Sequence, residues 1–126
     1  MQAAGPDQRT MRVMALAHAH PGQVVDVSPL GARLPEAQTT ALFKSDDLEV
    51  MRVVLRAGRS LPPHQVPGEI TIQCVEGELA LSVDGADRAL HAGQLLYLRG
   101  GAVHDLRAVR DSSALVTVAL VKPAQP

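Results

Sequence analysis

Two histidines lie in segments of this 126-residue chain where glycine recurs at short intervals, although they are far apart in the sequence. His64 follows Gly58, and His104 follows Gly101. Neutral imidazole nitrogens bind zinc, nickel, copper and iron, and they also accept hydrogen bonds from organic ligands. Two histidines that meet from distant positions are better evidence of a site than a local pair. The residue types therefore indicate a site for a metal or a small molecule, provided that the fold brings them together.

The glycines around these histidines follow the spacing of the two cupin motifs. Six positions hold the residue that the motifs require: Gly58, His64, Gly77, Gly93, Gly101 and His104. The chain therefore resembles the cupin family, and its strand pattern extends the resemblance to residues 40–122.

Other motif positions hold different residues. Val66 stands where the first motif has its second histidine, and Ile70 stands where it has a glutamate, with Glu69 one residue out of step. In the second motif Arg99 replaces a proline. Two of the four usual metal ligands are therefore present.

The resemblance implies an all-β fold, the antiparallel jelly roll or double-stranded β-helix barrel, with His64 and His104 at its mouth. A divalent transition metal (Zn, Ni, Fe, Cu or Mn) would be the cofactor. Glu69 would be the third metal ligand if a bulge after Pro67-Gly68 turned it inward. In the alternative phase Ile70 and its alternate neighbours face inward, Glu69 points out and the pocket holds no metal.

Two further residues are candidates for binding the organic ligand together with the two histidines. Gln73 would face the pocket if its strand ran in the opposite phase, and Tyr97 lies at a strand end before the Gly100-Gly101 turn. The amide and the phenol both make directional hydrogen bonds.

The elements that would hold these residues are strands. Leu48–Leu55 is apolar on both faces, which is typical of a strand covered on both sides. Glu78–Asp84 alternates between apolar and polar residues, and Asp84-Gly85 is a strong signal for a tight turn. Many short strands, with no convincing helix in the last two thirds of the chain, predict an antiparallel barrel or sandwich. The other predicted strands are residues 69–76, 94–98, 103–109 and 114–121.

The beginning of the chain gives weaker signals. Met11, Met14 and His18 recur at helical spacing, and Gln23–Val27 is a candidate short strand. We expect residues 1–39 to form an extension of short irregular elements that packs on a barrel of residues 40–122, followed by a tail at 123–126.

Composition argues against several functional classes. With 12 basic and 13 acidic residues, and no block of like charge, no nucleic-acid or membrane partner is expected. The single cysteine, Cys74, permits no disulfide within the chain, and the apolar stretch Met11–Ala19 is too short to span a bilayer. The expected location is the cytoplasm. Neither a nucleophile elbow nor a phosphate-binding loop occurs.

The sequence thus predicts a small single-domain cupin that binds a small molecule in the barrel mouth, with or without a divalent metal. The alternative is a metal-free, non-catalytic effector-binding or sensor module. The activities of the family are too varied for the resemblance to indicate a reaction. The resemblance also implies a homodimer, formed through Leu48–Leu55 or Ala114–Val121, because only one face of each strand can point into its own barrel.

Overall fold

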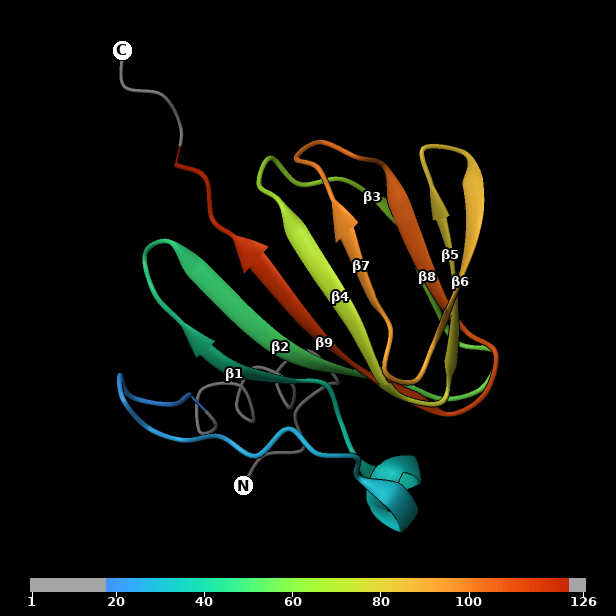
Figure 1. Cartoon of the computed structure of the whole chain (residues 1–126), viewed down its shortest axis with the longest axis horizontal. Coiled ribbons are helices and arrows are strands. Elements are labelled where there is room, and N and C mark those ends of the chain that lie inside the picture. The colour runs from blue at the N-terminus through green and yellow to red at the C-terminus, as the bar shows by residue number, and fades with distance from the viewer. Residues whose placement is uncertain (1–17, 123–126) are drawn as a thin grey trace, which may run out of the picture.

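The structure is a computed structural model of the chain, and it describes residues 18–122. Within these residues, nine strands form two antiparallel sheets that pack face to face (Figure 1). One sheet has the strand order β1-β2-β9-β4-β7 and the other β3-β8-β5-β6. This arrangement confirms the predicted all-β jelly roll. The strands are β1 Thr40–Lys44, β2 Leu48–Leu55, β3 Ser60–His64, β4 Ile70–Glu76, β5 Glu78–Val83, β6 Ala86–His91, β7 Leu95–Leu98, β8 His104–Ala108 and β9 Ser112–Ala119.

The hydrophobic core lies between the two sheets because apolar residues alternate along the strands. In β4, Ile70, Ile72 and Cys74 are buried, whereas Gln73 between them is exposed. Strands β5, β8 and β9 contribute further buried aliphatic side chains to the same cluster. The strand alternation read from the sequence therefore assigns the core faces correctly.

Three strands were not predicted individually. The predicted barrel begins at residue 40, but the sequence gives no bounds for a strand before Leu48–Leu55, so β1 was not identified. Strand β3 lies at a sheet edge and contains Pro62 and Pro63, which donate no ladder hydrogen bonds. In β6 only Leu90 is buried, so no alternation marks it. The prediction of a strand at Gln23–Val27 is wrong, because these residues have no ladder partner among residues 18–122.

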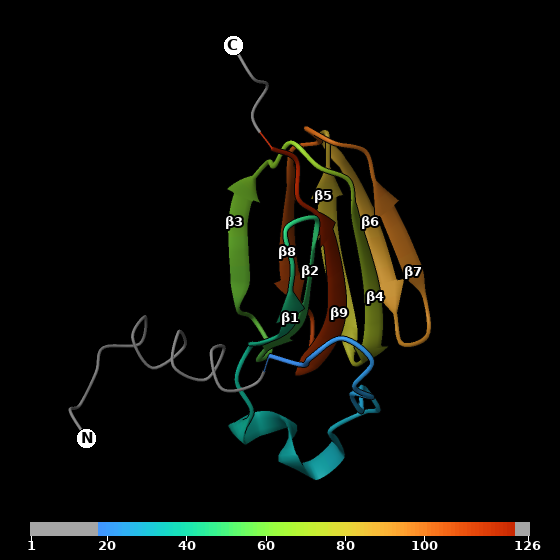
Figure 2. The same cartoon turned by 90° about the vertical axis from the view of Figure 1, so that its left-hand side faces the viewer.

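Residues 18–39 run along the lower side of the barrel and include a 3-10 helix, η1 Gly31–Glu36 (Figure 2). The Ala19 amide donates to the carbonyl of Leu42 in β1 over 2.6 Å, and Leu34 of η1 is buried. The helical spacing that begins at Met11 falls mainly outside the described residues.

A polar network joins this N-terminal segment to the outer face of the five-stranded sheet. The Glu76 carboxylate accepts hydrogen bonds from the amides of Leu30 (2.9 Å) and Gly31 (3.0 Å) and from the hydroxyl of Ser113. Arg52 is buried beside it, with Nη1 3.9 Å from Glu76 Oε2. Although burial opposes its charge, these hydrogen bonds and the Arg52 guanidinium together lower the pKa of Glu76.

A bulge in β4 explains why Glu76 lies outside the barrel. The register of β4 against β9 shifts between Cys74 and Glu76, so that Cys74 opposes Ala114 and Glu76 opposes Ser113. One extra residue reverses the alternation, so Glu76 leaves the core face on which Cys74 lies.

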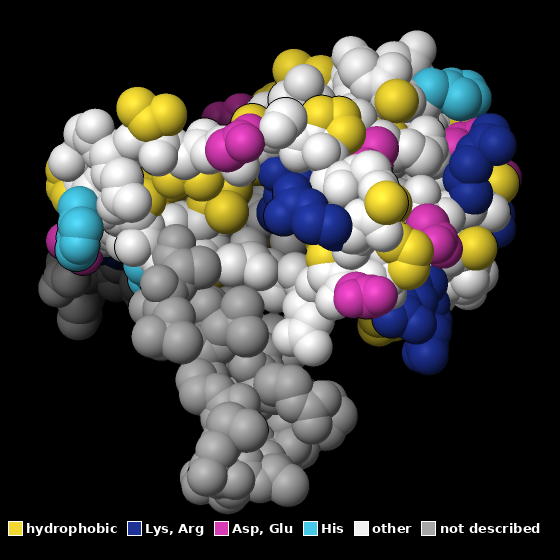
Figure 3. All heavy atoms as spheres, turned by 90° about the horizontal axis from the view of Figure 1, so that it is seen from below, with side chains coloured by type: hydrophobic (Ala, Val, Ile, Leu, Met, Phe, Trp, Pro, Cys, Tyr) yellow, Lys and Arg dark blue, Asp and Glu magenta, His cyan; other side chains and the backbone are white. Residues whose placement is uncertain are grey.

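The described surface mixes charges of both signs. On the face drawn in Figure 3, acidic and basic side chains lie near one another among apolar ones. In residues 18–122 no helix is both long enough and apolar enough to cross a membrane.

Candidate ligand-binding site

The fold brings His64 and His104 together, as the sequence predicts. The two residues are direct partners in the antiparallel ladder of β3 and β8, and their ring centroids are 4.3 Å apart with an interplanar angle of 54°. Directly opposed residues in such a ladder have side chains on the same face of the sheet and within contact distance. The contact between the rings is therefore a property of strand register.

A bulge in β3 sets the direction of the His64 side chain. Leu61 opposes Leu106 and His64 opposes His104, so β3 uses three steps where β8 uses two. The extra residue falls at Pro62-Pro63. Residues three apart in a regular strand point to opposite faces. Because of the bulge, Leu61 and His64 both line the barrel interior.

The backbone fixes the tautomer of both rings. His64 Nδ1 lies 3.2 Å from the carbonyl oxygen of Pro62, and His104 Nδ1 lies 3.1 Å from that of Ala102. A carbonyl oxygen only accepts hydrogen bonds, so each Nδ1 carries a hydrogen atom and donates a hydrogen bond to that oxygen. In the neutral form each ring then has an unprotonated Nε2, which accepts a hydrogen bond or binds a metal.

The rings border a cavity of about 360 Å³ inside the barrel. Its wall is aliphatic apart from Glu49, His64 and His104. His104 is 5% exposed, whereas His64 is exposed at the end of β3. The apolar residues around the cavity are Met51, Val53, Leu61, Val66, Pro67, Gly68, Ile70, Ile72, Leu106, Val116, Val118, Ala119, Leu120 and Val121.

The other three predicted site residues lie outside this cavity. Glu69 precedes β4 and is exposed, and its Oε2 accepts a hydrogen bond of 2.7 Å from the hydroxyl of Tyr97. Tyr97 is 61% exposed on β7, and its bond to Glu69 raises the pKa of the phenol. Gln73 is exposed on the outer face of β4. The placement of these three residues in the barrel mouth is therefore wrong. The inward phase belongs to Ile70, Ile72 and Cys74 in β4, and to Leu96 and Leu98 in β7.

Comparison with protein families agrees with this geometry. The profile described as Cupin domain matches residues 51–120, which is more than half of the 126 residues. The chain belongs to the cupin family.

Solved structures share the cupin fold over most of their length. A conserved protein of unknown function from Streptococcus pyogenes is 20% identical with a TM-score of 0.67, and the match covers 84% of this chain and 94% of that one. A cupin superfamily protein from Desulfitobacterium hafniense is 15% identical, with a TM-score of 0.68 and coverage of 82% and 100%. An RmlC-like cupin from Desulfovibrio desulfuricans is 27% identical, with a TM-score of 0.64 and coverage of 77% and 97%. No curated protein matches the chain.

Among the described residues, the cavity holds two of the four ligands of the cupin motifs, His64 and His104. Val66 and Ile70 stand at the motif positions of the missing ligands, and both line the cavity as apolar side chains. Among residues 18–122 no three His, Cys, Asp or Glu side chains are grouped closely enough to hold an ion. Catalytic zinc sites generally use three protein ligands, so His64 and His104 alone do not fit such a site.

Glu49 is a residue of the site that the sequence analysis missed. It lies on the inner face of β2 with Met51 and Val53, and it is half-buried at the wall of the cavity. The alternation within Leu48–Leu55 places Glu49 on the face of Met51 and Val53, and this signal could have identified it. Apolar residues on the other face concealed the pattern.

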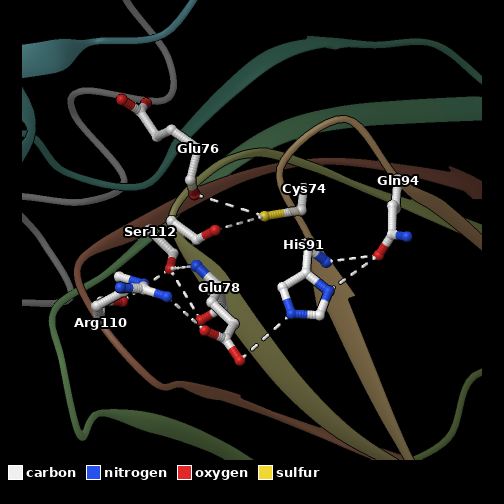
Figure 4. Close-up of polar contacts among 8 residues, drawn as sticks. Cys74, Glu76, Glu78, His91, Gln94, Arg110 and Ser112 are labelled. Carbon is white, nitrogen blue, oxygen red and sulfur yellow. Dashed lines mark hydrogen bonds and ion pairs between the residues drawn. The ribbon is translucent and has the colours of Figure 1, made fainter.

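A second polar cluster lies at the opposite end of the barrel. His104 opposes Val83 at the end of β5, whereas the cluster forms around Glu78 at the start of β5. Figure 4 shows the Glu78 carboxylate between Arg110 and His91. Its oxygens lie 2.7 Å from Arg110 Nη2 and 3.5 Å from His91 Nε2. These contacts link the start of β5, the end of β6 and the turn between β8 and β9. None of the three residues lines the cavity.

Proposed function

We propose that this cupin binds a small, largely apolar organic molecule in the barrel cavity and works as a binding module without a resident metal. The observation that carries the proposal is the pair of imidazoles of His64 and His104, which both line an aliphatic cavity and whose Nδ1 atoms face backbone carbonyls, so that Nε2 is the acceptor of each neutral ring. Such a pair orients a ligand through its hydrogen-bond donors, while the aliphatic wall supplies affinity by burying apolar surface.

The size and lining of the cavity support this proposal. Ligand pockets in proteins are typically about 300–1,000 Å³ and mostly apolar, with a few polar groups that fix orientation. The cavity of about 360 Å³, with only three polar side chains in its wall, fits the lower end of this range. A molecule with one ring and a short side chain matches that space.

The donor count favours a binding module over a metal-dependent enzyme. Two imidazoles without a third protein ligand hold a divalent ion weakly, and the carboxylate predicted to complete the set is bonded to Tyr97 outside the barrel. A cytoplasmic location and a homodimer remain expectations from the sequence.

The test is a titration with 2-phenylethanol and related small alcohols and amines, followed by nitrogen NMR of the imidazole side chains. We expect the resonances of His64 and His104 to shift together and those of His91 to remain constant. His64→Gln and His104→Gln should each weaken binding about tenfold, whereas the matched control His91→Gln should not.

The result that contradicts the proposal is a panel in which no compound shifts either ring. Metal analysis of the purified protein supplies the second readout. One equivalent of a tightly retained transition metal, lost in His64→Gln, would show that a metal-dependent function is the correct reading instead.

A further inference from the structure

The polar side chains of the cavity share a chemical property that restricts the ligand. Glu49 contributes a carboxylate, and His64 and His104 contribute the lone pairs of their Nε2 atoms. A carboxylate and the Nε2 of a neutral Nδ1–H imidazole are both hydrogen-bond acceptors. No lysine, arginine, hydroxyl or amide side chain lines the cavity among the described residues. The side chains of the wall therefore offer acceptors and no donor.

Glu49 has no fixed positive partner inside the barrel. Its cross-strand neighbours are Lys44 in β1 and Val118 in β9. Lys44 lies directly opposite Glu49, and so on the same face of the sheet, but it is exposed and does not line the cavity. No ion pair between the two side chains occurs within residues 18–122. The carboxylate of this half-buried residue thus forms no ion pair among the described residues, and a cationic ligand in the cavity would supply one.

We propose that the ligand of this cavity is a small apolar amine, bound as its ammonium ion, and not a carboxylate or a phosphate. This inference rests on the proposed function and adds the chemical class of the ligand. An ammonium group donates hydrogen bonds to Glu49 and to the imidazole lone pairs, and its charge offsets that of the carboxylate. An anionic ligand would lose its hydration without gaining a side-chain donor and would be repelled by Glu49.

The aliphatic wall of the cavity would bind the hydrocarbon part of the ligand. Met51, Val53, Ile72 and Val116 belong to β2, β4 and β9 and line the same cavity as the three acceptors. A hydrocarbon body packed against these side chains leaves water, and such burial contributes about 25 cal/mol for each Å² of apolar surface. The combination favours a molecule with one cationic end and one hydrocarbon end.

The experiment compares three probes with a phenyl ring and a two-carbon chain, 2-phenylethylamine, 2-phenylethanol and phenylacetate, by calorimetry and imidazole NMR at neutral pH. We expect the amine to bind at least about tenfold more tightly than the carboxylate, which corresponds to one charge-assisted hydrogen bond. Glu49→Gln should weaken binding of the amine about tenfold and leave binding of the alcohol unchanged. The matched control Glu69→Gln removes the same charge outside the barrel and should leave the binding of all three probes unchanged.

Two results separate failure of this inference from failure of the proposed function. If the carboxylate binds as tightly as the amine and shifts the rings of His64 and His104, the ligand class is wrong and the binding function stands. The same conclusion follows if Glu49→Gln binds the amine as well as the unchanged protein does. If none of the probes shifts either ring, the proposed function fails and the ligand class fails with it.

Discussion

Replacement of Glu76 by glutamine should loosen the N-terminal segment from the barrel. Glu76 is 14% exposed and accepts hydrogen bonds from Leu30, Gly31 and Ser113. Hydrogen bonds to a charged group contribute about 1.5–3 kcal/mol each, and removing one partner of a buried ion pair costs about 3–5 kcal/mol. Because glutamine keeps the shape and one acceptor oxygen, we expect Glu76→Gln to lower the free energy of unfolding by about 2–4 kcal/mol.

Urea unfolding followed by circular dichroism measures the total loss, and amide hydrogen exchange locates it. The amides of Leu30 and Gly31 should exchange faster in Glu76→Gln than in the unchanged protein. Glu36→Gln is the matched control, because it removes an exposed carboxylate of the same segment and should change stability by less than about 0.5 kcal/mol. If Glu76→Gln behaves like Glu36→Gln in both measurements, the carboxylate does not anchor the segment.

The lowered pKa of Glu76 adds a dependence on pH with a defined sign. Its pKa in the folded protein lies below the ordinary value of 4.5, so between the two values the unfolded chain binds more protons than the folded one. The contribution of Glu76 to stability is therefore complete above about pH 4.5 and is lost as pH falls through the folded pKa. Glu76→Gln should show a shallower decrease in stability over this acidic range than the unchanged protein.

Three further predictions concern the cavity, the thiol and the surface. Val66→His should give a protein that retains one equivalent of zinc after dialysis, because it adds a third imidazole to the cavity wall; a zinc content like that of the unchanged protein would count against the placement of Val66. Cys74 should resist disulfide-exchange reagents in the native protein and react on unfolding, because it is buried and burial raises the pKa of the thiol. Leu95 and Tyr97 are 64% and 61% exposed on the edge strand β7, so the expected homodimer should use this strand; a double change to lysine should shift the sedimentation coefficient to that of a monomer, and a protein that is already monomeric would contradict the dimer.

The N-terminal segment also changes the expected dimer interface. The sequence predicts this interface at Leu48–Leu55 or Ala114–Val121, because both strands have two apolar faces. In the structure, Arg52 and Ser113 lie on the outer faces of these strands, and both are buried beside the segment that precedes β1. Part of the second face is therefore covered by the chain itself.

The sequence is sufficient to predict that His64 and His104 meet, but not which other side chains line the cavity with them. The reason is that β-bulges are hard to recognise in a sequence. Glycine spacing and alternation identify the strands and the face of each regular run, so His64, His104 and the core phase of Ile70 could be inferred. A bulge changes the face of every residue beyond it and leaves little trace in composition. One of the two phases left open by the sequence requires a bulge before Glu69, whereas β4 has its bulge before Glu76 and β3 has one at Pro62-Pro63.

The two histidines differ in how firmly the fold holds them. His104 belongs to β8, which has ladder partners on both sides, whereas His64 ends β3, an edge strand paired with β8 alone. Pro62 and Pro63 have no amide hydrogen, so neither donates a hydrogen bond to that single ladder. Opening of β3 thus requires fewer broken hydrogen bonds than opening of β8. We expect a ligand to enter by outward movement of β3, with His104 staying in place and His64 completing the contact as the strand closes.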